Sequence, residues 1–254
     1  MKKTDLDKLI HSKSTAWRRY HEKIRIKSVP TNELQPYDWP ESWKKIYFKS
    51  YPRFDEVPLP KPQLRTKSLE VSLRERKSTR AFSSRKLSIQ QISTLLYYSA
   101  GISPDRKDRR FYPSGGYRYP VEIYLLSLNS QLKKGIYHYY VPNHSLERIF
   151  ENKKFEIKKT FTPFNLTWIS QASVIIVMTA VIGRSYIKYG DRAYKFIHLE
   201  AGHIGQNMYL ISSALGMGCC AIGGQVDSYI AKTLDLDETH EPIIYSMAVG
   251  NKNS

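Results

Sequence analysis

Lys188 and Tyr189 stand side by side and are the residues of this chain best suited to move a proton. A lysine becomes a general base when burial and nearby cations, here Arg184 or Arg192, lower its pKa from about 10.4. Tyr189 could relay the proton or orient a ring. The pair opens a polar stretch over 188–192 that we expect to form a turn, and an exposed loop dipeptide is the ordinary alternative.

Two other segments could hold an anion. Arg76, Ser78 and Arg80 alternate along the chain and offer two cations and a hydroxyl, which suit a phosphate or an electron-rich ring edge. A basic helix end, favoured by the helix dipole, explains the same residues more simply. The second segment is predicted to be a tight turn that exposes backbone N–H groups to an anion. Its residues are Pro113, Ser114, Gly115 and Gly116. A plain hairpin loop is the alternative.

A long helix is predicted after residue 192, because apolar side chains recur at spacings of four and three. They are Ile197, Ala201, Ile204, Met208, Ile211 and Leu215. A polar stripe of Glu200, His203 and Asn207 runs beside them. A glycine cluster then ends the helix and lets the backbone approach a flat or phosphorylated group. It comprises Gly216, Gly218, Gly223 and Gly224, and it lacks the strand that precedes GxGxxG in the dinucleotide fingerprint.

The remaining segments must position these groups. Residues 1–28 are predicted to be helical, and 29–62 form a proline-studded, aromatic arm that we expect to cover its own body or a second subunit. Further helices are predicted over 68–80, over 89–100 with Ser88 as cap and Gly101 as stop, over 153–160, and after a cap at Asp227. Strands are predicted over 121–129, 135–141, 146–150, 172–182 and 243–249.

Composition narrows the class of protein. With 254 residues, 41% hydrophobic and 25% charged, the chain is typical of a globular protein, and it has no signal core or membrane-length apolar run, so we expect a cytoplasmic location and no membrane partner. The adjacent Cys219 and Cys220 form a poor disulfide and an incomplete zinc site, so no metal is expected.

The net charge of +17 is concentrated before residue 196, since the segment from Phe196 onward holds two basic and six acidic residues. No zinc-finger, basic-zipper or single-strand stacking motif accompanies this charge, so we expect no nucleic-acid partner. We expect an anionic cofactor group or an acidic peptide instead, and a solvated basic surface is the alternative.

Four segments in this order carry a family resemblance: Arg-Lys-Ser-Thr-Arg at 76–80, Pro-Ser-Gly-Gly-Tyr-Arg-Tyr-Pro at 113–120, Lys-Tyr-Gly-Asp-Arg at 188–192 and Ala-Ile-Gly-Gly at 221–224. The chain resembles the nitroreductase-like FMN flavoprotein superfamily. Within it, the chain resembles the azoline dehydrogenases of thiazole/oxazole-modified microcin biosynthesis. Tyr20-His21-Glu22 and the proline-rich arm resemble the same subfamily, so the resemblance covers about the whole chain.

The resemblance implies an α+β fold, with an antiparallel-rich central sheet flanked by helices and FMN at a homodimer interface. Residues 1–62 would form the N-terminal helix and arm, and 63–254 the catalytic domain. Arg76 would hold the phosphate, and Gly223 would offer its N–H to the flavin N5. The other implied cofactor residues are Ser78, Arg80, Pro113, Ser114, Gly115, Gly116, His203, Asn207, Ala221, Ile222, Gly224 and Lys252, with Ser114 and its glycines reaching the partner's flavin.

The implied activity is oxidation of peptide thiazolines and oxazolines to thiazoles and oxazoles. Lys188 takes a proton from the alpha carbon, the flavin takes a hydride from the neighbouring carbon, and dioxygen reoxidises the flavin. The implied partners are a ribosomal precursor peptide and a cyclodehydratase complex, and no long N-terminal extension is present to recognise a leader peptide. An NAD(P)H-dependent nitro- or quinone reductase and a flavin-containing scaffold subunit are the alternatives.

Overall fold

The computed structural model describes residues 16–26, 36–64, 67–151 and 155–253. The strands are β1 Glu56–Pro58, β2 Ile102–Ser103, β3 Arg106–Arg110, β4 Val121–Ser127, β5 Gly135–Tyr140, β6 Ser145–Glu151, β7 Val174–Ala180, β8 Met217–Ile222 and β9 Ile243–Asn251. Seven of them form one sheet in the order β1-β6-β5-β4-β7-β9-β8, in which all neighbours are antiparallel. The predicted α+β class and antiparallel-rich sheet are confirmed.

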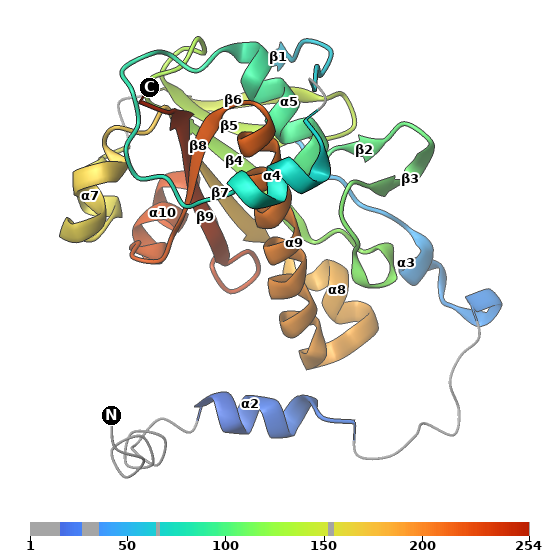
Figure 1. The fold of residues 1–254 in the computed structure, drawn as a ribbon. Coiled ribbons are helices and arrows are strands. Elements are labelled where there is room, and N and C mark those ends of the chain that lie inside the picture. Colours follow the sequence, from blue (N-terminus) through green and yellow to red (C-terminus); the bar gives the residue numbers. More distant parts are fainter. Residues whose placement is uncertain (1–15, 27–35, 65–66, 152–154, 254) are drawn as a thin grey trace.

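Helices cover both faces of this sheet (Figure 1). The helices are α2 Ala16–Ile24, α3 Glu41–Lys44, α4 Leu69–Glu75, α5 Ile89–Ala100, α6 Ile157–Thr160, α7 Pro163–Ile169, α8 Ile182–Tyr189, α9 Ala193–Ala214 and α10 Asp227–Leu234, with 3-10 turns at Pro36–Asp38, Gly115–Tyr117 and Gly190–Arg192. Helices α5 and α9 pack on one face, and α7 and α10 on the other. Helix α4 lies against α9.

The central strand β7 is buried on both faces. Val174 and Ile176 join the core beneath α5 and α9, whereas Ile175 and Val177 join the core beneath α7 and α10. A strand covered on both sides reads as a continuous apolar run. This explains why the sequence identifies it, although the strand stops at Ala180 and Ile182 already begins α8.

Helix α9 is the element along which the predicted site residues are distributed. Its 22 residues span about 33 Å, and four of its predicted core residues, Ile197, Ala201, Ile204 and Met208, are buried. It approaches the sheet closely at Gly205, where an added Cβ would lie 2.6 Å from Cε1 of Tyr245. A glycine is therefore required at this point of the helix.

The segment around Lys188 and Tyr189 differs from the prediction. Both residues belong to the last turn of α8, and only Gly190–Arg192 forms a polar 3-10 turn. The helix forms because it buries Arg184 and Ser185 against the body, and it ends at Gly190, whose φ is +53°. The Lys-Tyr pair is thus held by a helix and not by a loop.

The glycine cluster also differs from the prediction. Gly216, with φ +70°, ends α9 as expected, but residues 217–222, for which no strand was predicted, form strand β8. Cys219 and Cys220 belong to the cores on opposite faces of the sheet. Because both faces of the strand are buried, its sequence does not alternate between polar and apolar residues, and this pattern could not identify it. Helix α4 ends at Glu75, and Thr79 N–H then donates to Cys219 O at 2.9 Å.

Other predicted elements are largely present. Ser88 forms a full capping box with Gln91 at the start of α5, and Gly101 follows its end. Asp227 is the first residue of α10 and not its cap, which is Val226. The predicted helices over 1–28 and 153–160 fall partly outside the described residues, and they appear as α2 and α6.

Buried charges anchor α8 to the sheet. Glu122 contacts Arg184 Nη1 at 2.5 Å and His138 Nε2 at 2.9 Å, and His138 Nδ1 lies 2.7 Å from Glu147. Burial alone would raise the pKa of Glu122, but the His138 hydrogen bond and the Arg184 charge lower it to about 2. Glu147 also accepts a hydrogen bond from Tyr51 N, which ties the arm to the same network.

Replacing Gly205 by alanine should destabilise the protein, because the new methyl group overlaps the Tyr245 ring, at a cost of about 1–3 kcal/mol. Gly183→Ala in α8 is the control, since its Cβ meets nothing within 4 Å and alanine favours a helix by up to about 1 kcal/mol. Thermal unfolding checks both variants. Equal midpoints for Gly205→Ala and wild type would contradict the close packing of α9.

Candidate functional site

The Lys-Tyr pair lies directly against the turn of residues 113–116. Gly116 has φ +60°, and an added Cβ there would lie 2.5 Å from Tyr189 Oη and 3.0 Å from Lys188 Nζ. A Cβ at Gly115 would touch the Tyr189 and Phe196 rings at 3.7 and 3.8 Å. The structure therefore brings together two segments that the sequence singled out separately, and it shows that glycines leave the space for the pair.

The buried side chain of Arg118 connects the elements that carry this arrangement. Its side chain is 2% exposed, and its Nε donates to Arg184 O at 2.8 Å. Its other nitrogens donate to Trp43 O and, at 3.1 Å, to Ser42 O. One buried guanidinium thus joins the end of the glycine turn, helix α8 and the arm.

The surroundings of Lys188 favour its neutral form. Its side chain is half-buried, and burial, followed by the charge of Arg118, lowers the pKa of Lys188. The sequence named Arg184 or Arg192 as the helping cation, but Arg184 is paired with Glu122. The direction of the shift is the one that a general base needs at neutral pH.

Glu200 completes this group and was not among the predicted site residues. It is 2% exposed, its Oε1 accepts from Gly115 N at 3.1 Å, and its Oε2 has no hydrogen-bond partner among the described residues. Burial raises the pKa of Glu200 to about 7, although hydrogen bonds from Ser114 and Gly115 act to lower it. The carboxyl group is therefore poised to exchange a proton near neutral pH. Its place in the polar stripe of α9 was the available signal.

A second group forms where the segment after α4 crosses β8. Ser78 Oγ lies 3.1 Å from Tyr209 Oη, which also accepts from Ala221 N at 2.8 Å. The Arg76 guanidinium carbon stands 5.5 Å from the centre of the Tyr209 ring, and that of Arg80 stands 5.7 Å from the Trp168 ring. Tyr209, which the sequence analysis missed, therefore links the basic segment to Ala221.

The second group is strongly cationic. Lys252 lies near it, joined through the bridge between Phe82 and Lys252, and burial followed by the charges of Lys77 and Lys67 lowers its pKa. Neither Arg76 nor Arg80 has an ion pair within the described chain. These cations, with the Ser78 hydroxyl, are the donors that a phosphate requires.

The glycines at the end of β8 leave part of this surface open. A Cβ at Gly223 would meet nothing within 4 Å, and Gly223 is exposed. Ile222 is buried, and Gly224 O accepts from Asn165 Nδ2 at 3.1 Å. A flat ring can therefore approach the backbone at Gly223, so these residues fit the FMN that the sequence analysis expects.

The two groups lie apart on one chain. Tyr209 stands nine positions after Glu200 in α9, which is about 14 Å along the helix. His203 is exposed between them, and Asn207 Nδ2 donates to Phe111 O at 3.1 Å and Ser99 O at 3.4 Å. A hollow of about 540 Å³ runs beside the turn, lined in part by Pro113, Ser114 and Gly116.

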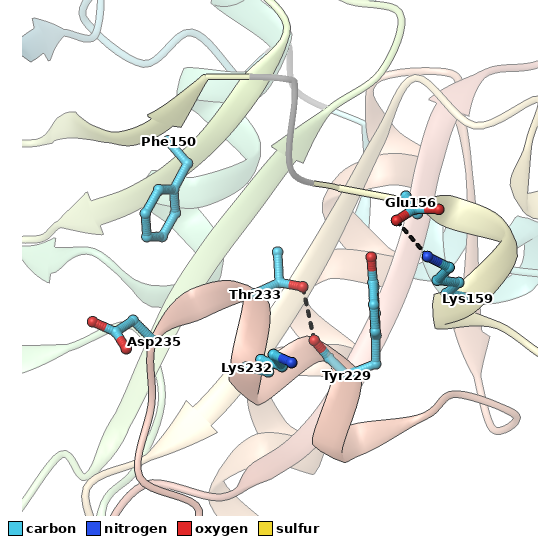
Figure 2. A pocket seen from close by; sticks show the side chains of 7 residues that line it. All are labelled: Phe150, Glu156, Lys159, Tyr229, Lys232, Thr233 and Asp235. Atoms are coloured by element: carbon cyan, nitrogen blue, oxygen red, sulfur yellow. Dashed lines mark hydrogen bonds and ion pairs between the residues drawn. The ribbon is translucent and has the colours of Figure 1, made fainter.

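A different hollow, of about 620 Å³, lies between β6, α6 and α10 (Figure 2). Its lining residues are Phe150, Glu156, Lys159, Tyr229, Lys232, Thr233 and Asp235. None of the predicted site residues lines it, and its Lys159 is already paired with Glu156 at 2.7 Å. The two groups along α9 are therefore the candidate functional site.

Within the described part of the chain, no group of three or more histidine, cysteine, aspartate or glutamate side chains is arranged to hold a metal ion. Among the same residues, no helix combines the length and apolar character needed to cross a bilayer.

Comparison with known proteins gives a family match over residues 73–251, to the Nitroreductase family. MJ1384 of Methanocaldococcus jannaschii, which carries the provisional name of a nitroreductase, is 29% identical over 199 residues, 78% of this chain and 98% of that protein. The Microcin B17-processing protein McbC of Escherichia coli is 32% identical over 166 residues, 63% of this chain and 61% of McbC.

A solved structure shows the same fold. A chain of the E. coli Microcin synthetase McbBCD complex with truncated pro-MccB17 bound superposes with a TM-score of 0.61, at 22% identity and over 98% of both chains. The match includes the region before residue 73, where the described part of the arm adds β1 to the main sheet.

Replacing Glu200 by glutamine should change how stability depends on pH. The pKa of Glu200 is raised from its ordinary 4.5 to about 7, so its stabilising effect is complete below pH 4.5 and is lost as the pH rises through 7. Glutamine keeps the acceptor for Gly115 N and does not titrate. When the pH is raised from 5 to 8, the thermal midpoint should therefore fall less for the Glu200→Gln variant than for wild type. Parallel curves would contradict a buried, titrating Glu200.

Proposed function

The chain belongs to the nitroreductase family, and we propose that it is an FMN-dependent azoline dehydrogenase that oxidises thiazolines or oxazolines in a ribosomal peptide. The observation that carries the proposal is the half-buried Lys188, whose pKa is lowered and whose Nζ faces the glycine turn beside Tyr189. The similarity to McbC, a protein named for microcin B17 processing, supports a role in peptide maturation.

The reaction requires a base for one proton. Converting an azoline to an azole removes a proton from the alpha carbon and a hydride from the adjacent ring carbon, and the two carbons become doubly bonded. FMN, when bound, supplies the hydride acceptor, and dioxygen later takes its electrons. Lys188 Nζ, whose pKa burial and the charge of Arg118 lower, accepts the proton.

Tyr189 and Glu200 give that proton a place to go. Tyr189 is held in place by its edge contact with the Phe196 ring, 5.0 Å between centroids, and it stands beside Lys188 over Gly116. Burial, followed by the nearby Glu200, raises the pKa of Tyr189, so its hydroxyl stays protonated and orients a substrate atom. With its pKa near 7, Glu200 can take up a proton while holding the turn through Gly115 N.

The cationic group is the proposed seat of the cofactor. Arg76 and Arg80 would hold its phosphate and pyrimidine edge, with Ser78 near the ribityl chain and Lys252 close by. The open backbone at Gly223 would receive the ring. The phosphate donors contact Tyr209, whereas the turn beside Lys188 contacts Glu200, about 14 Å away along α9. We therefore propose that each cofactor lies between two copies of the chain, with Ser114 and Gly115 facing the partner's flavin.

The surface supports such a homodimer. Large apolar side chains remain exposed on the packed helices α4 and α9, namely Leu69, Leu73, Tyr194 and Leu199, with exposures from 46% to 67%. Exposed apolar side chains on packed helices favour an interaction with another surface. The basic charge would then bind the precursor peptide and a cyclodehydratase complex.

An NAD(P)H-dependent reductase on the same fold is the second candidate function, favoured by the family name and by the similarity to MJ1384.

Lys188→Ala should retain FMN and lose azoline oxidation by about 10²–10⁴-fold, the worth of a general base. Mass spectrometry reports the loss of two hydrogens per ring, and absorbance of the released flavin reports the cofactor. Lys232→Ala is the matched control, because Lys232 is exposed on α10, on the opposite face of the sheet from α9. Normal turnover by Lys188→Ala would exclude the proposed base, whereas turnover only of nitro compounds with NADPH by wild type would favour the second candidate.

Leu199→Arg should turn the dimer into a monomer and release FMN, because it places a charge on the exposed apolar face of α9. Phe54→Arg is the control, since Phe54 is 43% exposed and precedes β1, at the edge of the sheet opposite β8. Light scattering and flavin absorbance measure both effects. A wild-type protein of monomer mass, near 29.6 kDa, that retains flavin would refute the shared site.

A further inference from the structure

Strand β8 forms one edge of the main sheet, since β9 is its neighbour on one side and the described chain adds no strand on the other. An edge strand presents backbone N–H and C=O groups that another element or a ligand must satisfy. Two of these groups already have partners: Thr79 N–H donates to Cys219 O at 2.9 Å, and Ala221 N–H donates to Tyr209 Oη at 2.8 Å. The edge is therefore closed as far as Ala221.

Gly223 is the next residue that the same side of the strand can present. Backbone groups on one side of a strand recur at every second residue, about 6.8 Å apart. Cys219, Ala221 and Gly223 follow this spacing. Gly223 is exposed, and a Cβ added there would meet nothing within 4 Å, whereas Ala221 is half-buried. The phenol of Tyr209 thus occupies the last backbone donor before the open position.

Tyr209 also contacts the hydroxyl of Ser78. The Tyr209 oxygen accepts from Ala221 N, so its own proton is free to point at Ser78 Oγ, 3.1 Å away. Ser78 is exposed, and a hydroxyl that accepts from Tyr209 keeps its own proton for a ligand. The Arg76 guanidinium carbon lies 5.5 Å from the centre of the Tyr209 ring. One side chain therefore meets a hydroxyl, a cation and the strand backbone of the proposed cofactor seat.

We propose that Tyr209 is the positioning residue that fixes where a flavin ring meets β8. Its oxygen occupies the Ala221 N–H, so the Gly223 N–H is the first free donor of the edge, and it makes Ser78 a donor for the ribityl chain. The proposal rests on the FMN-dependent function proposed above. Because Tyr209 acts through Ala221 and Ser78, removal of its hydroxyl should change where the ring is held as well as how tightly.

The first test titrates the full-length protein, freed of flavin, with FMN and with riboflavin. Tyr209→Phe keeps the ring beside Arg76 and removes only the hydroxyl, so FMN should bind about fivefold more weakly, the worth of one hydrogen bond. Riboflavin, which lacks the phosphate, should weaken by the same factor, because Arg76 is unchanged. Ser78→Ala should also weaken both flavins, and the double variant should lose less than the sum, because the two hydroxyls act together.

Tyr137→Phe is the matched control, because it removes a phenol that donates to Lys133 O at 2.7 Å on β5, away from β8. Its flavin affinity should match that of wild type. Thermal unfolding of the flavin-free variants reports any loss of the fold, and Ser78→Ala tests the same hydrogen-bonded chain without a change in α9.

The second test asks which backbone donor the ring meets. The N5 resonance of ¹⁵N-labelled FMN responds to the hydrogen bond at that atom. Wild type should give one resonance, and Tyr209→Phe should give a shifted or second resonance, because the freed Ala221 N–H competes with that of Gly223. The Tyr137→Phe protein should give the wild-type resonance.

An N5 resonance that is the same in Tyr209→Phe and wild type would overturn the positioning role, whatever the change in Kd. A loss of affinity no larger than that of Tyr137→Phe would also overturn it, and a wild-type protein that takes up no FMN would reject both proposals. Normal azoline oxidation with an N5 resonance insensitive to Tyr209 rejects the positioning role alone. An N5 resonance that depends on Tyr209, in a protein that oxidises no azoline, rejects the proposed reaction and leaves the positioning role supported.

Discussion

The buried guanidinium of Arg118 is the interaction on which the geometry of the site depends. It is 2% exposed and donates to carbonyl oxygens of the arm and of α8, and no carboxylate of the described residues forms an ion pair with it. Burying such a cation is costly unless its hydrogen bonds are made. The three carbonyls can meet it only when the arm, α8 and the glycine turn are assembled. The same charge helps lower the pKa of Lys188. One guanidinium therefore both joins the three segments and favours the form of Lys188 that can accept a proton.

The second constraint is the distribution of chemistry along α9. The helix carries Glu200 beside the glycine turn and Tyr209 beside the cationic group, and close packing at Gly205 fixes its distance from the sheet. One rigid helix therefore sets the spacing between the proton-transfer group and the proposed cofactor seat. It also exposes Leu199, so the surface that would unite the groups from two chains belongs to the same element.

The sequence predicted the elements whose burial pattern is regular. Strand β7, helix α9 and the Ser88 cap follow directly from apolar periodicity and cap chemistry. It missed β8, because Met217–Ile222 carries glycine and cysteine in place of alternating polar and apolar side chains. It also read Lys188 as part of a turn, because the helix depends on burying Arg184, a contact that local sequence does not reveal.

The site was predictable to the extent that it rests on motifs. The segments at 76–80, 113–116 and 188–189 were singled out. Only the fold reveals that the second and third lie together and that the first meets Tyr209. Glu200 was visible as part of a polar stripe, but its raised pKa comes from tertiary burial. Tyr209 is one aromatic residue among many, and only contacts distant in sequence distinguish it.

The most direct test of the central claim is anaerobic mixing of the FMN-loaded protein with a thiazoline-containing peptide, followed by flavin absorbance. Without dioxygen, transfer of the hydride from the ring leaves the flavin reduced. The account predicts bleaching of the flavin band by the peptide, one flavin per ring oxidised, and little bleaching by NADPH. Rapid bleaching by NADPH with none by the peptide would contradict it and identify the protein as a reductase of the same family.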